Sequence, residues 1–166
     1  MLREPAPVES IETDYLVIGA GAMGMAFLDE LVCHSKDLQV VVVDRRASPG
    51  GHWNDAYPFV RLHQPAAFYG VNSEVLGSGG DDLASKEEIT AYYARVMEKL
   101  CATGRVRFLP QCEYEGEGRV RSLADGAVYA VKARRKTVDG TYSDVTVPST
   151  TPPAYGVDPA IRLVPV

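Results

Sequence analysis

Apolar residues near the amino end of the chain follow two different patterns. Residues 15–18 form a short apolar run and residues 39–43 a β-branched one, as is typical of strands buried on both faces of a sheet. Between them, residues 22–33 carry apolar side chains at helical spacing, while Asp29 and Glu30 fall on a narrow polar face. The pattern therefore predicts a strand–helix–strand unit with parallel strands.

A second helix is indicated further along. Residues 85–88 (Ser-Lys-Glu-Glu) have the form of a capping box, in which serine and glutamate satisfy each other's free backbone N–H groups. Apolar residues then recur at helical spacing as far as Leu100, and Gly104 fits a helix end. Residues 106–109 predict a third strand, parallel to the first two.

Short runs separated by turn dipeptides follow this third strand. Asp125-Gly126 and Asp139-Gly140 are good hairpin signals. We expect an antiparallel β-meander lying against the parallel sheet, with strands at residues 112–115, 119–123, 128–136 and 141–147. The predicted fold class is α/β: a Rossmann-like domain with a parallel sheet and a βαβ unit, plus this meander. Residues 44–80 have no sustained period, and so long an irregular segment inside a compact domain is usually functional.

The first apolar run leads directly into a G-x-G-x-x-G sequence formed by Gly19, Gly21 and Gly24. Gly19 permits a tight turn, Gly21 leaves room for a pyrophosphate beside the backbone, and Gly24 lets the helix pack close to the sheet. Backbone N–H groups near Ala22 and Met23, with the positive end of the helix dipole, then face the phosphates.

Asp44 supplies the second half of this signature. It ends the β-branched run about twenty residues beyond the glycines, where an acidic side chain accepts hydrogen bonds from ribose hydroxyls. The order of elements predicts a dinucleotide site. The alternatives are a glycine-rich turn that binds nothing and, for Asp44, a residue that only forms a turn at the strand end. The carboxylate also repels a 2′-phosphate, so NADP is not expected here.

Composition narrows the function class. A chain of 166 residues with a net charge of -5 suits one domain and offers no bulk attraction to nucleic acid. No apolar run reaches the length of a membrane span. Cys33, Cys101 and Cys112 form no CxxC pair and the three histidines have no ligand spacing, so we expect a cytoplasmic setting without a metal site.

A second glycine turn extends the pattern toward a known family. After Asp44 and the basic Arg45, residues 50–53 form a Gly-Gly-x-Trp turn. This combination resembles the FAD-binding half of flavin-dependent monooxygenases and related FAD/NAD(P)-binding oxidoreductases. Residues 57–69 look like the segment that passes beneath the flavin in these enzymes, and the similarity runs over essentially the whole chain.

The resemblance implies a role for each residue of the first signature. Gly19, Gly21 and Gly24, with the backbone around them, would cradle the FAD pyrophosphate. Asp44 would hold the adenosine ribose. Arg45 would lie over the adenine ring or near a phosphate, or would be a solvated surface residue.

Other motif residues have both a functional and a purely structural interpretation. Gly50 and Gly51 would let the backbone approach the ribityl chain or the phosphates, or would form only a loop turn. Trp53 would pack along the flavin or in the core. His63 and Gln64 would lie near the isoalloxazine, or be satisfied within a loop. No catalytic base or nucleophile is expected, because the flavin carries the chemistry.

This chain departs from the family pattern in three ways. Family members run to several hundred residues with an inserted NADPH domain, so the chain resembles an incomplete N-terminal fragment. Its expected parts are an extension at 1–12, a FAD/NAD(P)-binding domain at 13–150, and a Pro-rich tail or linker to an absent second domain at 151–166. The family's return strand approaches the cofactor, at residues 144–147 here, and ends in an Ala-Thr-Gly turn, whereas residues 147–150 of this chain are Val-Pro-Ser-Thr. No C-x4-C dithiol follows the first helix, which argues against a disulfide reductase.

We therefore expect the FAD-binding portion of a flavoprotein oxidoreductase that resembles NAD(P)H-dependent flavin monooxygenases. FAD is the expected cofactor and NAD(P)H the co-substrate of the full-length enzyme. The isolated chain is expected to be inactive because the NADPH half is missing. The alternatives are a non-catalytic dinucleotide-binding module or truncated gene product, and an NAD-dependent dehydrogenase domain, which would need a proton-transfer residue that is not visible. The sequence does not name the substrate.

Overall fold

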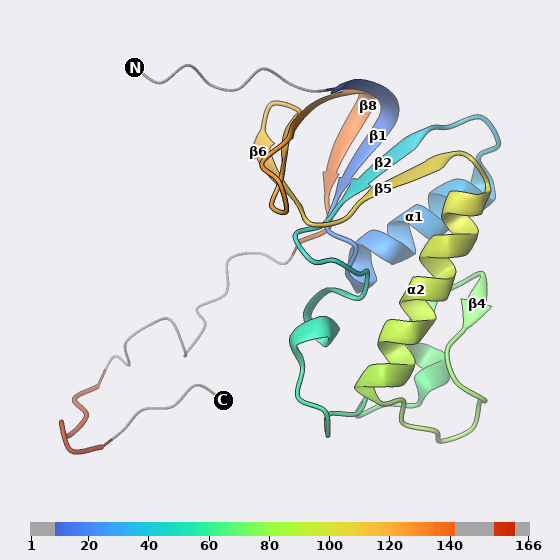
Figure 1. Cartoon of the computed structure of the whole chain (residues 1–166). Coiled ribbons are helices and arrows are strands. Elements are labelled where there is room, and N and C mark those ends of the chain that lie inside the picture. The colour runs from blue at the N-terminus through green and yellow to red at the C-terminus, as the bar shows by residue number, and fades with distance from the viewer. Residues whose placement is uncertain (1–8, 142–154, 162–166) are drawn as a thin grey trace.

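A six-stranded mixed sheet organises the computed structural model of the chain, which describes residues 9–141 and 155–161 (Figure 1). The strand order is β5-β2-β1-β8-β7-β6, and the first four strands are parallel neighbours. In sheet order these four are Val106–Leu109 (β5), Val40–Val43 (β2), Glu9–Ile18 (β1) and Val128–Asp139 (β8). The predicted third parallel strand is thus confirmed as β5, which lies beside β2.

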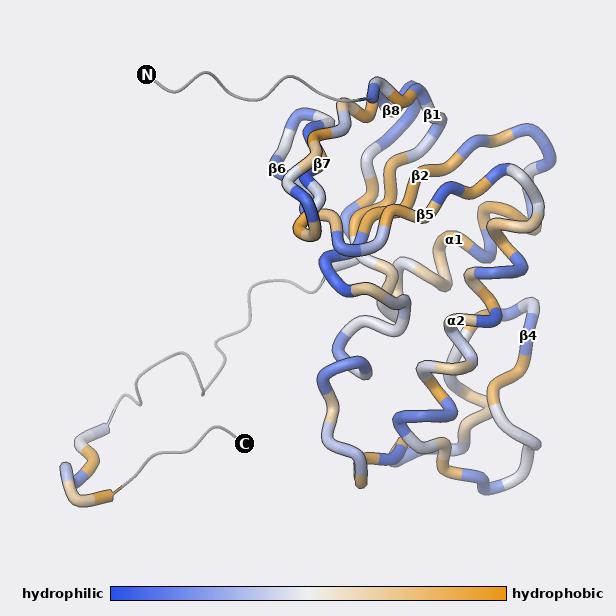
Figure 2. The backbone as a smooth tube through the Cα atoms, in the orientation of Figure 1, coloured by the Kyte–Doolittle hydropathy of each residue, from blue (hydrophilic) through white to orange (hydrophobic). Residues whose placement is uncertain are grey.

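Both faces of the central strands are covered. All four valines of β2 are buried, and Figure 2 shows this strand as hydrophobic along its length. The helices α1 (Ala22–His34) and α2 (Lys86–Ala102) lie on one face of the sheet (Figure 1). They enclose a core that includes Val17, Met25 and Tyr92.

The predicted start of α2 is confirmed by its hydrogen bonds. The Ser85 hydroxyl accepts the backbone N–H of Glu88 at 3.3 Å. The Glu88 carboxylate accepts the backbone N–H of Ser85 at 2.7 Å, which completes the capping box.

The second face of the sheet is covered by the antiparallel strands β6 (Cys112–Gly116) and β7 (Arg119–Ser122). Leu16, Val41 and Val120 belong to the core that joins these strands to β1 and β2. An antiparallel meander therefore lies against the parallel sheet, as predicted.

β8 differs from the prediction in its length and its partners. It extends beyond the expected end at residue 136, and it pairs antiparallel with β7 only through residues 128–130. It pairs parallel with β1 along nearly the whole of that strand, so β8 is the strand that returns beside β1. The side chains of residues 134–137 are all exposed, so this part of β8 lacks the alternation of apolar and polar residues by which a strand is predicted. Its pairing with β1 holds it in the sheet. Residues 144–147, which were expected to return there, and the turn at 147–150 lie outside the described residues.

β1 begins at Glu9, so part of the expected extension at 1–12 belongs to the sheet. Ile11 is buried, whereas the neighbouring Glu12 is exposed and its carboxylate lies 3.1 Å from the amine of Lys132 on β8. This alternation is typical of a half-buried strand. Because polar residues interrupt it, residues 9–14 form no apolar run that would predict a strand.

The irregular segment after β2 contains only short elements, as its lack of a period predicts. They are the 3-10 helices η1 (Gly51–Asp55) and η2 (Ala66–Phe68), and a hairpin of β3 (Gly70–Val71) and β4 (Glu74–Val75). The hydroxyl of Tyr92 on α2 holds this hairpin, accepting the Val71 N–H at 2.8 Å and donating to the Glu74 carbonyl at 2.5 Å. Neither helix in the described ranges is long and apolar enough to cross a membrane.

Candidate functional site

Three chain segments meet at the carboxyl end of the parallel strands. β1 continues into the first glycine turn at Gly19, β2 ends beside Asp44, and β8 ends beside Gly140. The Gly140 N–H donates to the Ile18 carbonyl at 2.8 Å, which holds the end of β8 against the start of the turn. In open α/β sheets this edge is where ligands bind.

Close backbone packing explains two glycines of this edge. A methyl group added at Gly24 would lie 1.9 Å from the Gly19 carbonyl oxygen, so only glycine allows α1 to approach β1 this closely. A methyl group added at Gly140 would lie 3.0 Å from the Gly24 Cα. Gly19 itself has φ +90°, which favours glycine. Sequence reasoning assigned Gly19 and Gly24 to the site but treated Gly140 only as part of a hairpin signal.

The amino end of α1 has the features of an anion site. Gly21 is the N-cap, no described side chain caps the helix, and the first turn carries no acidic residue. Met23 in this first turn is 73% exposed, so solvent reaches the helix end. The backbone N–H groups around Ala22 and Met23, together with the helix dipole, favour a bound phosphate.

Asp44 is buried and directly connected to the first glycine turn. One carboxylate oxygen accepts the Ala20 N–H at 2.7 Å, and the other accepts the Arg46 N–H at 2.8 Å. A carboxylate has about four acceptor sites, so each oxygen keeps a lone pair after these bonds. The backbone thus orients Asp44 and leaves it able to accept a ligand hydroxyl.

The turn at Gly50 and Gly51 packs on the first glycine turn. The Gly50 N–H donates to the Ala20 carbonyl at 2.8 Å, and both glycines have positive φ, +116° and +57°. A methyl group added at Gly51 would lie 2.9 Å from the Gly21 Cα, whereas one added at Gly21 would lie 3.5 Å from the Gly51 Cα. The open side of Gly21 therefore faces Gly51, a contact that the sequence did not indicate.

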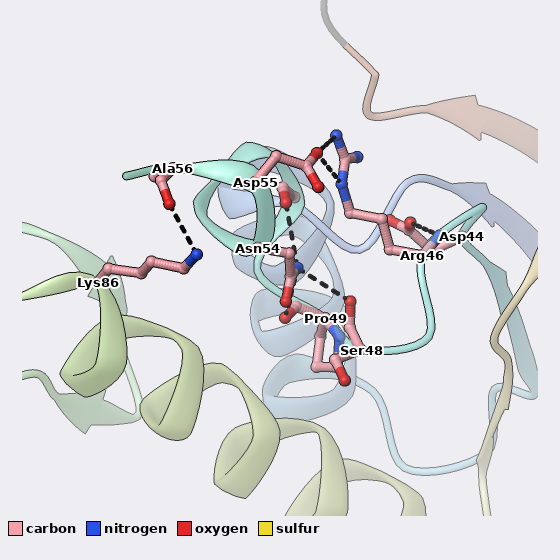
Figure 3. A network of polar contacts seen from close by, with 9 residues as sticks. Asp44, Arg46, Ser48, Pro49, Asn54, Asp55, Ala56 and Lys86 are labelled. Carbon is pink, nitrogen blue, oxygen red and sulfur yellow. Dashed lines mark hydrogen bonds and ion pairs between the residues drawn. The ribbon is translucent and has the colours of Figure 1, made fainter. Parts of the chain in front are cut away.

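Asn54 and its neighbours fix this second turn (Figure 3). The side-chain amide of Asn54 donates to the carbonyls of Ser48, Pro49 and Gly51 at 3.2, 3.3 and 3.1 Å. The guanidinium of Arg46 pairs with the Asp55 carboxylate, and the Lys86 amine donates to the Ala56 carbonyl at 2.7 Å. Sequence reasoning missed Asn54, because its three partners are backbone carbonyls, which the residue pattern does not show.

An aromatic cluster supports the second turn from the side of α2. Trp53 is buried in the core, and its indole N–H donates to the Tyr69 hydroxyl at 2.8 Å, which supports the structural interpretation of this residue. The rings of Tyr69 and Tyr93 pack edge to face with centroids 6.2 Å apart. Burial raises the pKa of the Tyr93 phenol far above its usual range.

The remaining predicted site residues are Arg45, His63 and Gln64. Arg45 is exposed, and its Nε lies 3.5 Å from the carboxylate of Glu113 on β6. His63 is exposed and Gln64 half-buried. The backbone on both sides of these two residues bonds to the segment that precedes α2, through Leu62 to Ala84 and Ala66 to Asp82.

A separate hollow of about 420 Å³ lies at the opposite end of β1. Ile11, Val128 and Val131 contribute its apolar lining, and the Glu12–Lys132 ion pair lies at its edge. At about 3.3 Å per residue, the strand between Ile11 and its carboxyl end spans roughly 23 Å. The hollow is therefore distinct from the glycine turns.

Known proteins match the part of the chain that forms this site. The family model described as an NAD(P)-binding Rossmann-like domain matches residues 17–72, which include both glycine turns and Asp44. Uncharacterised proteins of Mycobacterium tuberculosis and Mycobacterium bovis are each 51% identical to this chain over 169 residues. The match covers 95% of this chain and 31% of each relative, so the chain spans about a third of their length.

Solved structures of flavin enzymes share the fold. A flavin-containing monooxygenase from Stenotrophomonas maltophilia has a TM-score of 0.58 at 24% identity, over 78% of this chain and 38% of that one. A cyclohexanone monooxygenase variant from a Rhodococcus species, bound to NADP+, has a TM-score of 0.54 at 24% identity, over 78% and 26%. A bacillithiol disulfide reductase from Staphylococcus aureus has a TM-score of 0.56 at 11% identity, over 78% and 38%. Residues 17–72 are therefore similar to an NAD(P)-binding Rossmann-like domain, and the chain has the fold of flavin monooxygenases and flavoprotein reductases, which confirms the resemblance.

Proposed function

We propose that this chain is the FAD-binding portion of a flavoprotein oxidoreductase similar to NAD(P)H-dependent flavin monooxygenases. The observation that carries the proposal is the uncapped amino end of α1, which lies between two packed glycine turns with Asp44 hydrogen-bonded to the first of them. This arrangement supplies donors for a pyrophosphate and an acceptor for a ribose in one place.

The residues present fit such a cofactor. The N–H groups at Gly21, Ala22 and Met23 would hold the pyrophosphate, and Asp44 would hold the adenosine ribose. The exposed Arg45 would lie on the adenine side of the site, beside β6. When bound, FAD supplies redox chemistry by accepting a hydride, and the protein supplies binding and orientation.

Gly50 and Gly51 would form the second wall of the site through their backbone. We keep Trp53, His63 and Gln64 as proposed neighbours of the flavin, although the buried and hydrogen-bonded indole of Trp53 is also explained by core packing.

The complete reaction belongs to a longer protein in this proposal. The relatives are about three times as long as their match to this chain. We assign the binding of the NAD(P)H co-substrate and of the unidentified small-molecule substrate to such additional regions, and we expect no turnover from the isolated chain. A cytoplasmic location fits the three free cysteines.

A non-catalytic dinucleotide-binding module is the second candidate. It is favoured by the match to an NAD(P)-binding family model and by Asp44, which suits the adenosine ribose of any dinucleotide without a 2′-phosphate. A protein that binds NAD and ADP equally well and has no preference for FAD would support this second function.

Flavin binding by the purified chain tests the first proposal. We expect yellow protein, and titration with FAD should quench the flavin fluorescence with saturation. Asp44→Ala should weaken FAD binding by about tenfold or more, because hydrogen bonds to a charged group are lost. Asp37→Ala, which removes an exposed carboxylate beyond the far end of α1, serves as the control and should bind as the wild type does. Equal affinity in the Asp44→Ala variant would contradict the site.

A further inference from the structure

Resting on the proposed function, we propose that Asn54 is a positioning residue for the dinucleotide. It holds the backbone of the second glycine turn, which packs on the first glycine turn beside the N-cap of α1. Asn54 belongs to η1 and acts through the backbone of Pro49, Gly50 and Gly51.

A continuous path of hydrogen bonds joins Asn54 to the first glycine turn. The peptide between Pro49 and Gly50 is held at both ends: its carbonyl accepts from the Asn54 amide at 3.3 Å, and its N–H donates to the Ala20 carbonyl at 2.8 Å. The same amide donates to the Gly51 carbonyl at 3.1 Å. Asn54 thereby sets the orientation of the two peptides on either side of the glycine pair.

The glycine pair needs such a constraint. Glycine populates positive and negative φ almost equally, so a peptide beside Gly50 or Gly51 can rotate at little cost when nothing holds it. A rotated peptide would direct a carbonyl oxygen, which is partly negative, toward the helix end that receives the phosphates. With Asn54 in place, the carbonyls of Ser48, Pro49 and Gly51 are all directed to its amide.

The second glycine turn contacts the first, so holding the second turn in place also affects the proposed phosphate site. The Gly51 Cα lies so close to the Gly21 backbone that an added methyl group would be 2.9 Å away. A shift of the second turn therefore moves atoms directly beside the N-cap of α1. The neighbouring Asp55 also connects the second turn to Asp44: its carboxylate pairs with the Arg46 guanidinium, and the Arg46 backbone N–H donates to the Asp44 carboxylate.

Substitution of Asn54 tests the proposal. Asn54→Ala should weaken FAD binding by about tenfold, because the peptides flanking the glycine pair are released. Asn54→Asp, which has nearly the same shape but directs a carboxylate at three carbonyl oxygens, should weaken it further. Asn72→Ala is the matched control, since this exposed asparagine donates its amide to Glu30 on the side of α1, and it should bind as the wild type does.

Two readouts separate positioning from folding. Circular dichroism and thermal unfolding without ligand should be nearly unchanged in Asn54→Ala while FAD affinity falls. In the wild type, the side-chain amide proton signals of Asn54 should shift when FAD or ADP is added, and those of Asn72 should not, so the proposal is testable even if a variant fails to fold.

The possible results distinguish the two proposals. A wild type that binds neither FAD nor ADP contradicts the proposed function itself. A wild type that binds FAD, together with an Asn54→Ala variant of the same affinity or a stationary Asn54 amide signal, contradicts only the positioning role.

Discussion

Two glycines of the site, Gly24 and Gly51, leave no room for a methyl group. At Gly24 the obstacle is the Gly19 carbonyl oxygen at 1.9 Å, and at Gly51 it is the Gly21 Cα at 2.9 Å, added to a φ of +57°. Gly21 differs, because an added methyl group would make an ordinary contact at 3.5 Å and its φ is -78°. The glycines of this site therefore differ in how well they tolerate an added side chain.

Alanine substitutions at two of these positions should reveal that difference. Gly24→Ala should lower the free energy of unfolding by about 3 kcal/mol, because α1 must move away from β1. Gly21→Ala should lower it far less. Urea unfolding monitored by circular dichroism measures both changes. Equal destabilisation of the two variants would show that the close packing at Gly24 is absent.

For individual residues, the sequence predicted part of the site. Gly19, Gly24 and Asp44 come together as their order predicts, because a βαβ unit brings the ends of its two strands to one edge. Gly140 and Asn54 were not foreseen. Gly140 packs on Gly24 only because β8 returns beside β1, and Asn54 acts through carbonyl groups, which leave no mark in the residue pattern.

The elements differ in how far local residues determine them. α2 is bounded by its own capping box at Ser85 and Glu88, and α1 carries a continuous helical pattern. β8 depends instead on its neighbour β1. Its exposed basic residues Arg134 and Arg135 lie 3.2 and 3.5 Å from the carboxylate of Asp14 on β1, an attraction across strands that no local pattern shows. Elements held by local signals were predictable, and this strand's partner was not.

The capping box of α2 should make stability depend on pH. The backbone N–H of Ser85, followed by its side chain, holds the pKa of Glu88 below its ordinary value of 4.5. Because the folded pKa is lowered, the ionised carboxylate stabilises the fold above pH 4.5, and this stabilisation is lost as the pH falls through the folded pKa. The wild type should therefore exceed Glu88→Gln in unfolding free energy at neutral pH.

Urea unfolding of both proteins across the acidic range checks this expectation. The difference between them should be constant near neutral pH and should shrink as the pH falls below 4.5. A difference that grows as the pH falls would contradict the assigned role of Glu88.

At the scale of the whole molecule, the proposed ligand site lies at the carboxyl ends of the parallel strands. Helices cover one face of the sheet and the antiparallel strands cover the other, so the loops at this edge are held by two cores (Figure 1). The overall architecture was predictable because strand, helix and strand follow one another in the chain. The contact between the two glycine turns was not, because it depends on how the irregular segment after β2 folds back.

The most direct test of the account is the response of backbone amides to ADP, which carries the pyrophosphate and the ribose without the flavin. In a two-dimensional amide spectrum of the wild type, the signals of Gly21, Ala22 and Met23 should shift most on addition of ADP, and adenosine alone should shift them little. Saturable ADP binding that leaves these three signals in place, or a complete absence of binding, would contradict the central claim that the start of α1 holds the pyrophosphate.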